Sequence, residues 1–344
     1  MKPDKEITIY DIADQLGVSP ATVSRALNNS PSISVATRKK INALAEKLGY
    51  RHNHFASSLR LQKTHTIGVI LHELNSYFIT AVLAGIEKIV TEAKYNLIIA
   101  HSAENPNLEA ANARNLFHKR VDGLIASLSF ETEDLTHFKQ FQSKNIPIVF
   151  FDRVFETSET AKVIINNFQA GYDATAHLIN QGCKRIAHIT SSLKRNVYAE
   201  RKRGYKQALE DHKLKFDEKL VIIDGFKEDD AIRSAKRILA MKNLPDGIFI
   251  TNDFCAAVVM QILKDAGIRI PKDIAIVGFN NDIVGKIINP KLTTINYPGF
   301  EMGQVAASTL INHLKHVWDM NLTNTIVIKS ELIVRESSLK KGIK

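Results

Sequence analysis

Apolar and polar positions follow two alternating patterns along most of the chain. From Thr66 to Asn281, short runs rich in β-branched residues are separated by segments in which apolar residues recur every three or four positions. The first pattern is typical of buried strands and the second of amphipathic helices, so their alternation predicts parallel sheets covered on both faces. The predicted strands are TIGVIL, YNLIIAH, VDGLIASL, IPIVFFD, KVIIN, RIAHIT, KLVIID, GIFITND and IAIVGFN.

This alternation is interrupted at one point. In FFDRVFETSETAKVIINN, two predicted strands follow each other with a polar connector and no helix between them. The break indicates a boundary between two similar doubly wound α/β subdomains, which we assign to 66–161 with 293–323 and to 162–292 with 324–340. We expect the tail TIVIKSELIVRES to be shared between them, and a ligand to lie in the crevice at the carboxyl ends of the strands.

The first 50 residues have a different pattern, that of three short helices. The segment TIYD, which starts at Thr8, predicts a capping box, and Gly17 predicts the end of that helix. Ser19 predicts the cap of a second helix with Pro20 at its first position, and a third helix should run from about 34 to 48. Helices at this spacing predict an all-α helix-turn-helix domain, which residues 51–65, mildly helical in their first half, join to the rest of the chain.

The charge of the chain is consistent with a polyanionic partner. Its net charge is +10, and residues 1–60 hold nine Lys or Arg against five Asp or Glu, so the basic excess is densest there. The two cysteines, Cys183 and Cys255, predict neither a disulfide framework nor a metal site, and we expect no cofactor. Without an apolar leader or spanning segment, the expected compartment is the cytoplasm.

The second helix carries several hydrogen-bonding groups that its packing does not need. Val23 and Leu27 should face inward, whereas hydroxyl side chains and Arg25 remain available to a partner. A helix N-terminus with small hydroxyl residues suits phosphate, and an arginine one turn later can reach a guanine edge in the major groove. Each residue taken alone is better explained as a cap or a solvated surface group. Together with the preceding helix and turn, they predict DNA reading.

The segment ITIYDIADQLGVSPATVSRALNN resembles the N-terminal signature of the LacI family of bacterial transcriptional repressors. The resemblance continues through the whole chain in the segments TIGVIL, FDR, RIAHI, RKRGY, GIFITND, GIRIPKDIAIVGFNND, PKLTTINYP, EMGQVAASTL and ELIVRESS. It implies a core like that of periplasmic binding proteins, in which the second subdomain binds an effector and dimerises. It also implies a homodimer on a palindromic DNA operator, controlled by a small molecule.

The resemblance assigns residues to the DNA. Relatives read bases with the two residues that stand here as Pro20 and Ala21, which offer only apolar contact, so Arg25 becomes the main candidate for hydrogen-bonded readout. The resemblance also implies a hinge helix and linker over 51–65, in which Leu59 takes the place of a leucine that wedges open a central base step in the minor groove, with Arg60 beside it. The expected DNA-binding residues are Thr8, Ser19, Pro20, Ala21, Thr22, Ser24, Arg25, Asn28, Leu59 and Arg60.

Polar and aromatic residues gather at the predicted strand ends, and the resemblance implies that they bind the effector. Rings, carboxylates, amides and guanidinium groups suit a small hydroxylated molecule. The expected effector residues are Tyr77, Phe78, Asp152, Arg153, Arg195, Arg201, Phe226, Asn252, Asp253 and Asn280. Asp253 could instead only cap a helix, Arg153 pair with a surface acid, and Tyr77 with Phe78 form a helix-start staple.

Asn280 departs from the family pattern, since many relatives have aspartate there. An amide both donates and accepts, which favours a sugar over a purine-like ligand.

Two other classes of protein are disfavoured. A secreted sugar-binding protein would not carry the helix-turn-helix, and an enzyme would need a phosphate loop or nucleophile motif, which we do not find. The segment LKKGIK that follows RESS is too short for a heptad coiled coil, so we do not expect a tetramer formed in that way.

Overall fold

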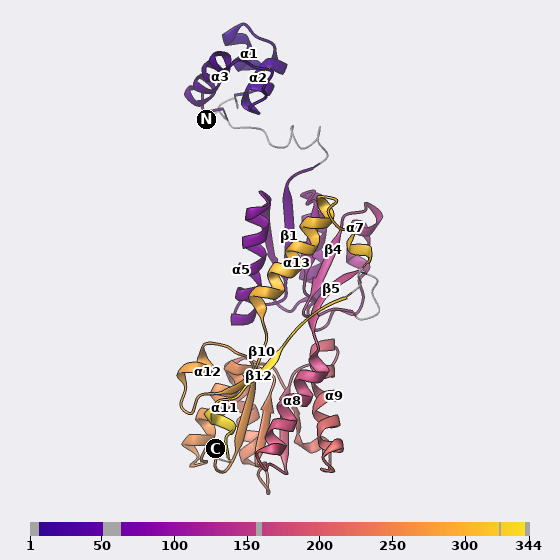
Figure 1. The fold of residues 1–344 in the computed structure, drawn as a ribbon, viewed down its shortest axis with the longest axis vertical. Coiled ribbons are helices and arrows are strands. Elements are labelled where there is room, and N and C mark those ends of the chain that lie inside the picture. The colour runs from indigo at the N-terminus through magenta and orange to yellow at the C-terminus, as the bar shows by residue number, and fades with distance from the viewer. Residues whose placement is uncertain (1–6, 51–62, 156–159, 323–324, 341–344) are drawn as a thin grey trace. The chain divides into compact units, whose positions relative to one another are not determined.

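The structure, a computed structural model, describes residues 7–50, 63–155, 160–322 and 325–340, which form two separate units (Figure 1). The first unit is a bundle of three helices, α1 (Ile9–Leu16), α2 (Pro20–Leu27) and α3 (Val35–Lys47). The second unit, from His65 onward, is an α/β core. No helix among the described residues is long and apolar enough to cross a membrane.

The three helices begin and end where local sequence chemistry predicts. Thr8 and Asp11 form a capping box on α1, and Gly17 ends that helix in the left-handed region at φ 61°. Ser19 and Ser34 cap α2 and α3 by accepting hydrogen bonds from the backbone three residues ahead. The bundle is held by a small apolar core of Ile12, Ala13, Val23, Ala26, Ile41 and Ala45.

The core contains two six-stranded sheets of equivalent topology. The first, which we call the N-sheet, has the order β11-β5-β4-β3-β1-β2, and all its neighbouring strands are parallel. Its strands are β1 (Thr66–Leu71), β2 (Asn96–His101), β3 (Gly123–Ala126), β4 (Ile148–Phe151), β5 (Ala161–Ile165) and β11 (Thr325–Ile328).

The second sheet, the C-sheet, has the order β12-β10-β9-β8-β6-β7, and only its β12 edge is antiparallel. Its strands are β6 (Ile186–Thr190), β7 (Val221–Ile223), β8 (Gly247–Ile250), β9 (Ala275–Asn280), β10 (Thr293–Asn296) and β12 (Glu331–Ile333). Each sheet with its helices is called a lobe below, the N-lobe and the C-lobe.

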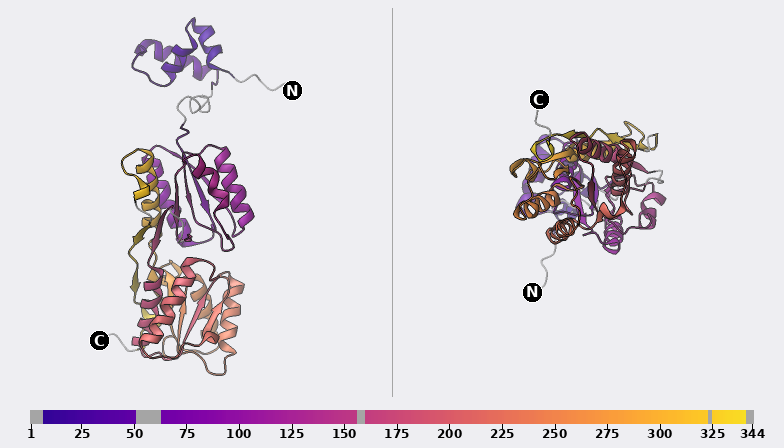
Figure 2. Two further views of the ribbon diagram at one scale, coloured as in Figure 1. Left: turned by 90° about the vertical axis from the view of Figure 1, so that its right-hand side faces the viewer. Right: turned by 90° about the horizontal axis from the view of Figure 1, so that it is seen from below.

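Helices cover both faces of each sheet (Figure 2). Those of the N-lobe are α5 (Tyr77–Glu92), α6 (Pro106–His118), α7 (Lys139–Ser143) and α13 (Gly299–Leu314), with short 3-10 turns at Thr136–Phe138 and Met320–Leu322. Those of the C-lobe are α8 (Asn167–Asn180), α9 (Asn196–Asp211), α10 (Glu228–Leu239), α11 (Asp253–Asp265) and α12 (Val284–Ile287), with 3-10 turns at Glu218–Leu220 and Glu336–Ser338.

Three strands belong to a different sheet from the one that the predicted subdomain boundaries gave them. β5 pairs with β4 and β11 in the N-sheet, although residues from 162 and from 324 onward were expected in the second subdomain. β10 pairs with β9 in the C-sheet, although 293 onward was expected in the first. The reason is that the chain crosses between the lobes three times. Each crossing comes one strand later along the chain than the corresponding predicted boundary. The tail is shared, as predicted, with β11 in one sheet and β12 in the other.

Close helix packing in the C-lobe fixes the position of α9. A Cβ added at Gly171 of α8 would collide with the backbone carbonyl of Arg201, and one added at Gly204 would collide with that of Phe168. The two helices therefore pack backbone to backbone, which holds the first turns of α9 rigidly at the carboxyl end of the C-sheet.

Candidate functional site

The first part of the candidate site is the exposed face of α2. Val23 and Ala26 are fully buried in the bundle core. On the opposite side, Ala21, Arg25 and Asn28 are exposed and Ser24 is half-buried, at the i, i+3, i+4 and i+7 spacing of one helix face. The bundle thus presents a short polar ridge that it does not use for packing.

Several groups on this ridge are already oriented by local hydrogen bonds. Arg25 Nε donates to the Ala21 carbonyl at 3.3 Å, and the Asn28 amide donates to the Ser24 carbonyl at 2.8 Å. At the helix start, the hydroxyls of Ser19 and Thr22 lie 2.9 Å apart. The Arg25 bond leaves the terminal amines of its guanidinium fork as the donors for a base edge.

The other expected DNA-binding residues are placed as follows. Thr8 is the exposed cap of α1, and its hydroxyl donates to Asp11 at 2.6 Å. Pro20 is half-buried at the first position of α2. Leu59 and Arg60 lie outside the described residues. Sequence reasoning missed Tyr10, whose side chain is 68% exposed in the first turn of α1, although the segment IYD displays it.

The second part of the candidate site lies where the two lobes meet, and its innermost group is Asp152. This residue follows β4 in the left-handed region, at φ 57°, and its carboxylate accepts a hydrogen bond from the Tyr297 hydroxyl at 2.6 Å. The ring of Tyr297 stacks on Phe78 with a centroid distance of 4.1 Å. Burial raises the pKa of Asp152.

Two arginines surround the aromatic ring of Tyr198 on α9. The Arg153 and Arg201 guanidinium carbons lie 5.6 and 5.3 Å from the centre of that ring. Arg153 pairs with Glu104 at 2.6 Å and stacks on Phe130 at 3.9 Å. The acid predicted as its alternative partner therefore exists, but it belongs to the site rather than to the outer surface, because the Glu104 side chain is only 24% exposed.

Arg201 makes neutral contacts only. Its Nε donates to the Asn167 side chain at 2.9 Å, its Nη1 donates to the Thr251 carbonyl at 3.4 Å, and its guanidinium lies 3.5 Å from the Phe279 ring centre. Burial lowers the pKa of Arg201, because the charged form loses its hydration.

A loop after β3 joins the N-lobe to the start of α9. Arg195 donates from Nη2 to the Thr132 carbonyl at 2.5 Å, and Lys194 pairs with Glu131. The loop itself is anchored by Glu109, a fully buried carboxylate of α6. Glu109 accepts from the Ser129 backbone and the Thr132 hydroxyl and lies 2.9 Å from His137 Nε2. Burial alone would raise the pKa of Glu109, but these hydrogen bonds outweigh burial and lower it.

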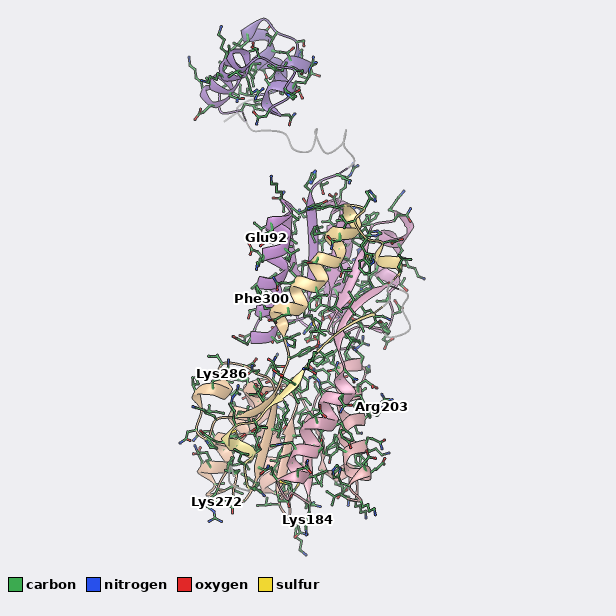
Figure 3. All side chains as sticks on the ribbon, viewed as in Figure 1. Glu92, Lys184, Arg203, Lys272, Lys286 and Phe300 are labelled. Atoms are coloured by element: carbon green, nitrogen blue, oxygen red, sulfur yellow. The ribbon has the colours of Figure 1, made fainter. Side chains whose placement is uncertain are left out.

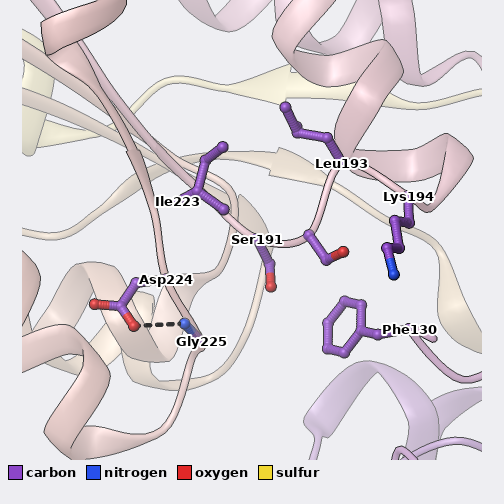
Figure 4. Close-up of a pocket in the computed structure, with 8 residues that line it drawn as sticks. Phe130, Ser191, Leu193, Lys194, Ile223, Asp224 and Gly225 are labelled. Atoms are coloured by element: carbon purple, nitrogen blue, oxygen red, sulfur yellow. Dashed lines mark hydrogen bonds between the residues drawn. The ribbon is translucent and has the colours of Figure 1, made fainter.

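An open cavity of about 650 Å³ lies between the same segments, a size within the usual range for small-molecule sites (Figure 4). Phe130 lines it from the N-lobe, and the segments after β6 and β7 line it from the C-lobe. Figure 4 shows Phe130 beside the Lys194 ammonium, with Asp224 and Gly225 on the opposite wall. The lining residues are Phe130, Ser191, Ser192, Leu193, Lys194, Ile223, Asp224 and Gly225.

None of the ten expected effector residues lines this cavity, but several adjoin it. Arg195 and Phe226 follow the lining residues Lys194 and Gly225 in the chain, and Arg153 stacks on Phe130. Tyr77, in contrast, is 51% exposed at the first position of α5, whose cap is Ser76. Phe78 is buried in the core, where it stacks on Tyr297.

Asn252, and not Asp253, is the cap of the helix that follows β8. Asn252 is the cap of α11 and accepts from the Cys255 backbone at 2.9 Å. Asp253 is fully buried, and its carboxylate accepts from the Thr294 hydroxyl and the Asp282 backbone, both at 2.8 Å. The alternative reading of Asp253 as a cap is therefore wrong. Burial raises its pKa to about 6.

Asn280 ends β9 with a φ of 116° and is half-buried. Its neighbour Asp282 is 6% exposed, and burial together with the charge of Asp253 raises the pKa of Asp282 to about 7. A hydrogen bond with Asn280 opposes that rise. The orientation of the Asn280 amide is thus linked to a buried acid that sequence reasoning did not select.

Sequence reasoning also missed Glu104, Phe130, Tyr198, Lys194, Asp224 and Tyr297. Glu104, Phe130 and Lys194 follow predicted strands within four residues, Asp224 ends one, and Tyr297 follows β10 directly, so an examination of every strand end would have found them. Tyr198 lies inside a helix and reaches the site through tertiary contacts, which no local pattern displays. Among the described residues, no group of three or more His, Cys, Asp or Glu could hold a metal ion.

Comparison with known proteins gives the family of both units. Residues 8–53 match the bacterial regulatory proteins of the lacI family, and residues 175–338 match the periplasmic binding protein-like domain. Catabolite control protein A of Priestia megaterium is 33% identical over 309 residues, which cover 90% of this chain and 92% of that protein. The chain belongs to the LacI family. It is accordingly a DNA-binding transcriptional regulator rather than an enzyme, and several of its relatives are named as repressors.

Two further LacI-family comparisons extend over nearly the whole chain. The ribose operon repressor of Haemophilus influenzae is 30% identical over 335 residues, which cover 96% of this chain and 98% of that protein. A structure of the transcriptional regulator CelR in complex with cellobiose is 25% identical, with a TM-score of 0.72 over 96% of this chain and 100% of that one. The helix-turn-helix and the two-sheet core are both family features.

Proposed function

We propose that this LacI-family regulator binds a two-fold symmetric operator as a homodimer and is controlled by a sugar or sugar derivative bound between the lobes. The observation that carries the DNA part is the polar ridge of α2, defined above by Ala21, Ser24, Arg25 and Asn28. A helix of this kind lies in the major groove with its N-terminal residues at base edges. Arg25 supplies the hydrogen-bonded base contact, and Ser19 and Thr22 contact phosphates at the helix start.

The effector part rests on the chemistry between the lobes. The cavity joins an aromatic wall, Phe130, to hydroxyl, ammonium and carboxylate groups at the strand ends of the C-lobe. Such a combination fits a small polyhydroxylated molecule that stacks on a ring and hydrogen-bonds by its edge. The names of two relatives refer to ribose and to cellobiose, which supports the same ligand class. Because both lobes line the site, a bound effector changes the relation between them and so the DNA affinity.

Dimerisation rests on an exposed apolar patch formed by Phe254, Ile283 and Ile287. These side chains are 44, 54 and 75% exposed, and they lie on and beside α11 and α12, which pack against each other. Clustered apolar side chains of this size on a soluble domain usually mark a contact surface. A two-fold axis through this patch gives each operator half-site one helix-turn-helix.

Selection of bound DNA from a random library tests the operator. The expected result is a two-fold symmetric sequence, and an enriched single half-site would contradict the dimer. Sedimentation of Ile287→Glu tests the patch, with Val317→Glu as a control because Val317 is 71% exposed on the N-lobe. Only the first substitution should produce monomers.

A thermal-shift screen of sugars and sugar derivatives identifies the effector. Gel shifts with and without the hit then show whether it weakens or strengthens DNA binding. If no compound that raises the Tm changes DNA binding, the control by an effector is wrong.

A further inference from the structure

We propose that the effector carries a negative charge, as a phosphate ester or a carboxylate of a sugar derivative, and that Arg195 is the residue that binds the anionic group. The inference rests on the proposed function and narrows its ligand class. It follows from the hydrogen bonds and charges around the start of α9.

Arg195 is a buried cation with unused donors. It is only 4% exposed, and of its guanidinium nitrogens Nη2 has the Thr132 carbonyl as acceptor, whereas Nε and Nη1 have none among the described residues. A buried N–H without an acceptor destabilises the fold, and more so on a charged group. A native fold retains such donors where a ligand supplies the missing acceptors.

The carboxylates near Arg195 are each engaged by another group. Glu104 is paired with Arg153, Glu109 with His137, and Glu131 with Lys194. These are the acids whose charge acts on Arg195, and none of them contacts its guanidinium. Burial lowers the pKa of Arg195, followed by the charge of Arg153.

Two further guanidinium groups add positive charge to the same region. Arg153 and Arg201 are 5 and 3% exposed, and the Nε of Arg153 also lacks an acceptor. Among the described residues, Arg201 contacts amide, carbonyl and aromatic groups and no carboxylate. Asp152 is also buried nearby, its carboxylate accepts a hydrogen bond from Tyr297, and burial raises its pKa. Of the four acids in this region, Glu104, Glu109, Glu131 and Asp152, only Glu104 is paired with one of the three arginines, so Arg195 and Arg201 are buried cations without a carboxylate partner among the described residues.

The position also suits an anion. Arg195 is the residue before α9, a helix of 16 residues that begins without a side-chain cap, so its positive end is not neutralised by a side-chain oxygen. The preceding residue, Lys194, lines the cavity (Figure 4). A neutral sugar hydroxyl could accept one of the unused N–H groups, but it would leave the buried charge uncompensated. A phosphate or carboxylate group satisfies both requirements, since a guanidinium binds either one in a bidentate manner.

The first experiment measures the Tm of the full-length protein in inorganic phosphate against chloride at matched ionic strength. We expect a saturable rise of about 3 °C at ten times the Kd of phosphate. Arg195→Gln should abolish the rise and Arg195→Lys should restore part of it. Lys272→Gln, a surface lysine at the end of the C-lobe labelled in Figure 3, should behave as wild type. Absence of the rise in wild type, or an equal rise in Arg195→Gln, would overturn the proposal.

The second experiment needs no variant, and so remains valid if Arg195→Gln does not fold. Wild-type protein is titrated with matched pairs that differ only in charge: glucose with glucose 6-phosphate and gluconate, ribose with ribose 5-phosphate, and galactose with galacturonate. The anionic member should bind at least tenfold more tightly in one pair. If a neutral member binds as well as its anionic partners and also changes DNA binding, the sugar effector stands and the anion proposal falls. If phosphate binds through Arg195 but no anionic compound changes DNA binding, the anion site stands and its role as effector site falls.

Discussion

The helix-turn-helix and the region between the lobes both contain arginines that we expect to bind a partner, but these arginines differ in burial and in their contacts with the rest of the fold. Arg25 is exposed on a helix whose core lies on the other face, and its one hydrogen bond is to its own helix. Arg153, Arg195 and Arg201 are at least 95% buried and contact groups from several elements. The first arrangement separates binding from folding, whereas the second makes the binding groups part of the fold.

This difference has a consequence for how each site can change. Residues on the α2 ridge can be replaced with little cost in stability, so DNA specificity can vary independently of the bundle. A substitution between the lobes removes a ligand contact and a structural contact together. Mutations in the two regions should therefore differ in which property they alter.

The largest effect on DNA binding is expected from a substitution in the apolar core of the three-helix bundle. Val23→Asp buries a carboxylate among the five other apolar residues of the bundle core, so the bundle should unfold and operator binding should fall by at least about 100-fold. Calorimetry should show the transition of the α/β core unchanged. A matched control is Gln15→Asp, which introduces the same charge at an exposed position of α1 and should leave the bundle folded. Loss of the core transition in Val23→Asp would mean that the two units do not fold separately.

The next effect concerns the buried ion pair. Arg153→Met leaves Glu104 without its partner and removes the cation from Phe130, so the core should lose about 3 kcal/mol of stability. Urea unfolding of the core measures this loss. The double variant Arg153→Met/Glu104→Gln should recover part of it, because no carboxylate is then left unpaired. A single variant as stable as wild type would show that the site between the lobes is not structural.

Arg25→Ala should weaken operator binding by about 2 kcal/mol while leaving the Tm unchanged. Binding to operators substituted one base pair at a time measures the effect. The loss should be confined to one base pair of each half-site, and specificity should relax there. An equal loss on all sequences would instead make Arg25 a phosphate contact.

The smallest effect is in the pH dependence of the core. The folded protein holds a proton on Asp282, whose pKa is about 7, through a range in which the unfolded chain has released it. Stability therefore falls as the pH rises from about 4 to 7, and the loss is complete above that pKa. Asp282→Asn should reduce this slope and raise the stability of the core at pH 8 by about 1 kcal/mol. An unchanged slope would contradict the buried pair with Asp253.

The parts of the structure that local chemistry determines could be predicted from the sequence. The three helices of the bundle begin at Thr8, Ser19 and Ser34 because capping is a contact between near neighbours. The central strands of the core were visible as continuous apolar runs because both of their faces are buried. The sheet to which a strand belongs was not, since the pairing of β5 with β11 joins residues some 160 positions apart.

The same limit applies to the site between the lobes. Sequence reasoning selected the arginines at the strand ends but not their partners, because Glu104 and Tyr198 approach Arg153 from separate parts of the chain. Asn252 and Asp253 are both residues that favour a helix start, so the sequence could not decide which one caps α11. The structure decides it through Thr294, which holds the Asp253 carboxylate in the interior.

The three crossings between the lobes limit how the core can move. The chain passes from β5 to α8, from β10 to α13, and from β11 to β12 through connections of one or two residues. Sliding one lobe past the other would stretch all three connections at once, so bending and twisting are the motions that remain. The crossings also mean that no continuous stretch of the gene encodes a whole lobe. A C-terminal truncation at either of the first two would remove strands or helices from both lobes.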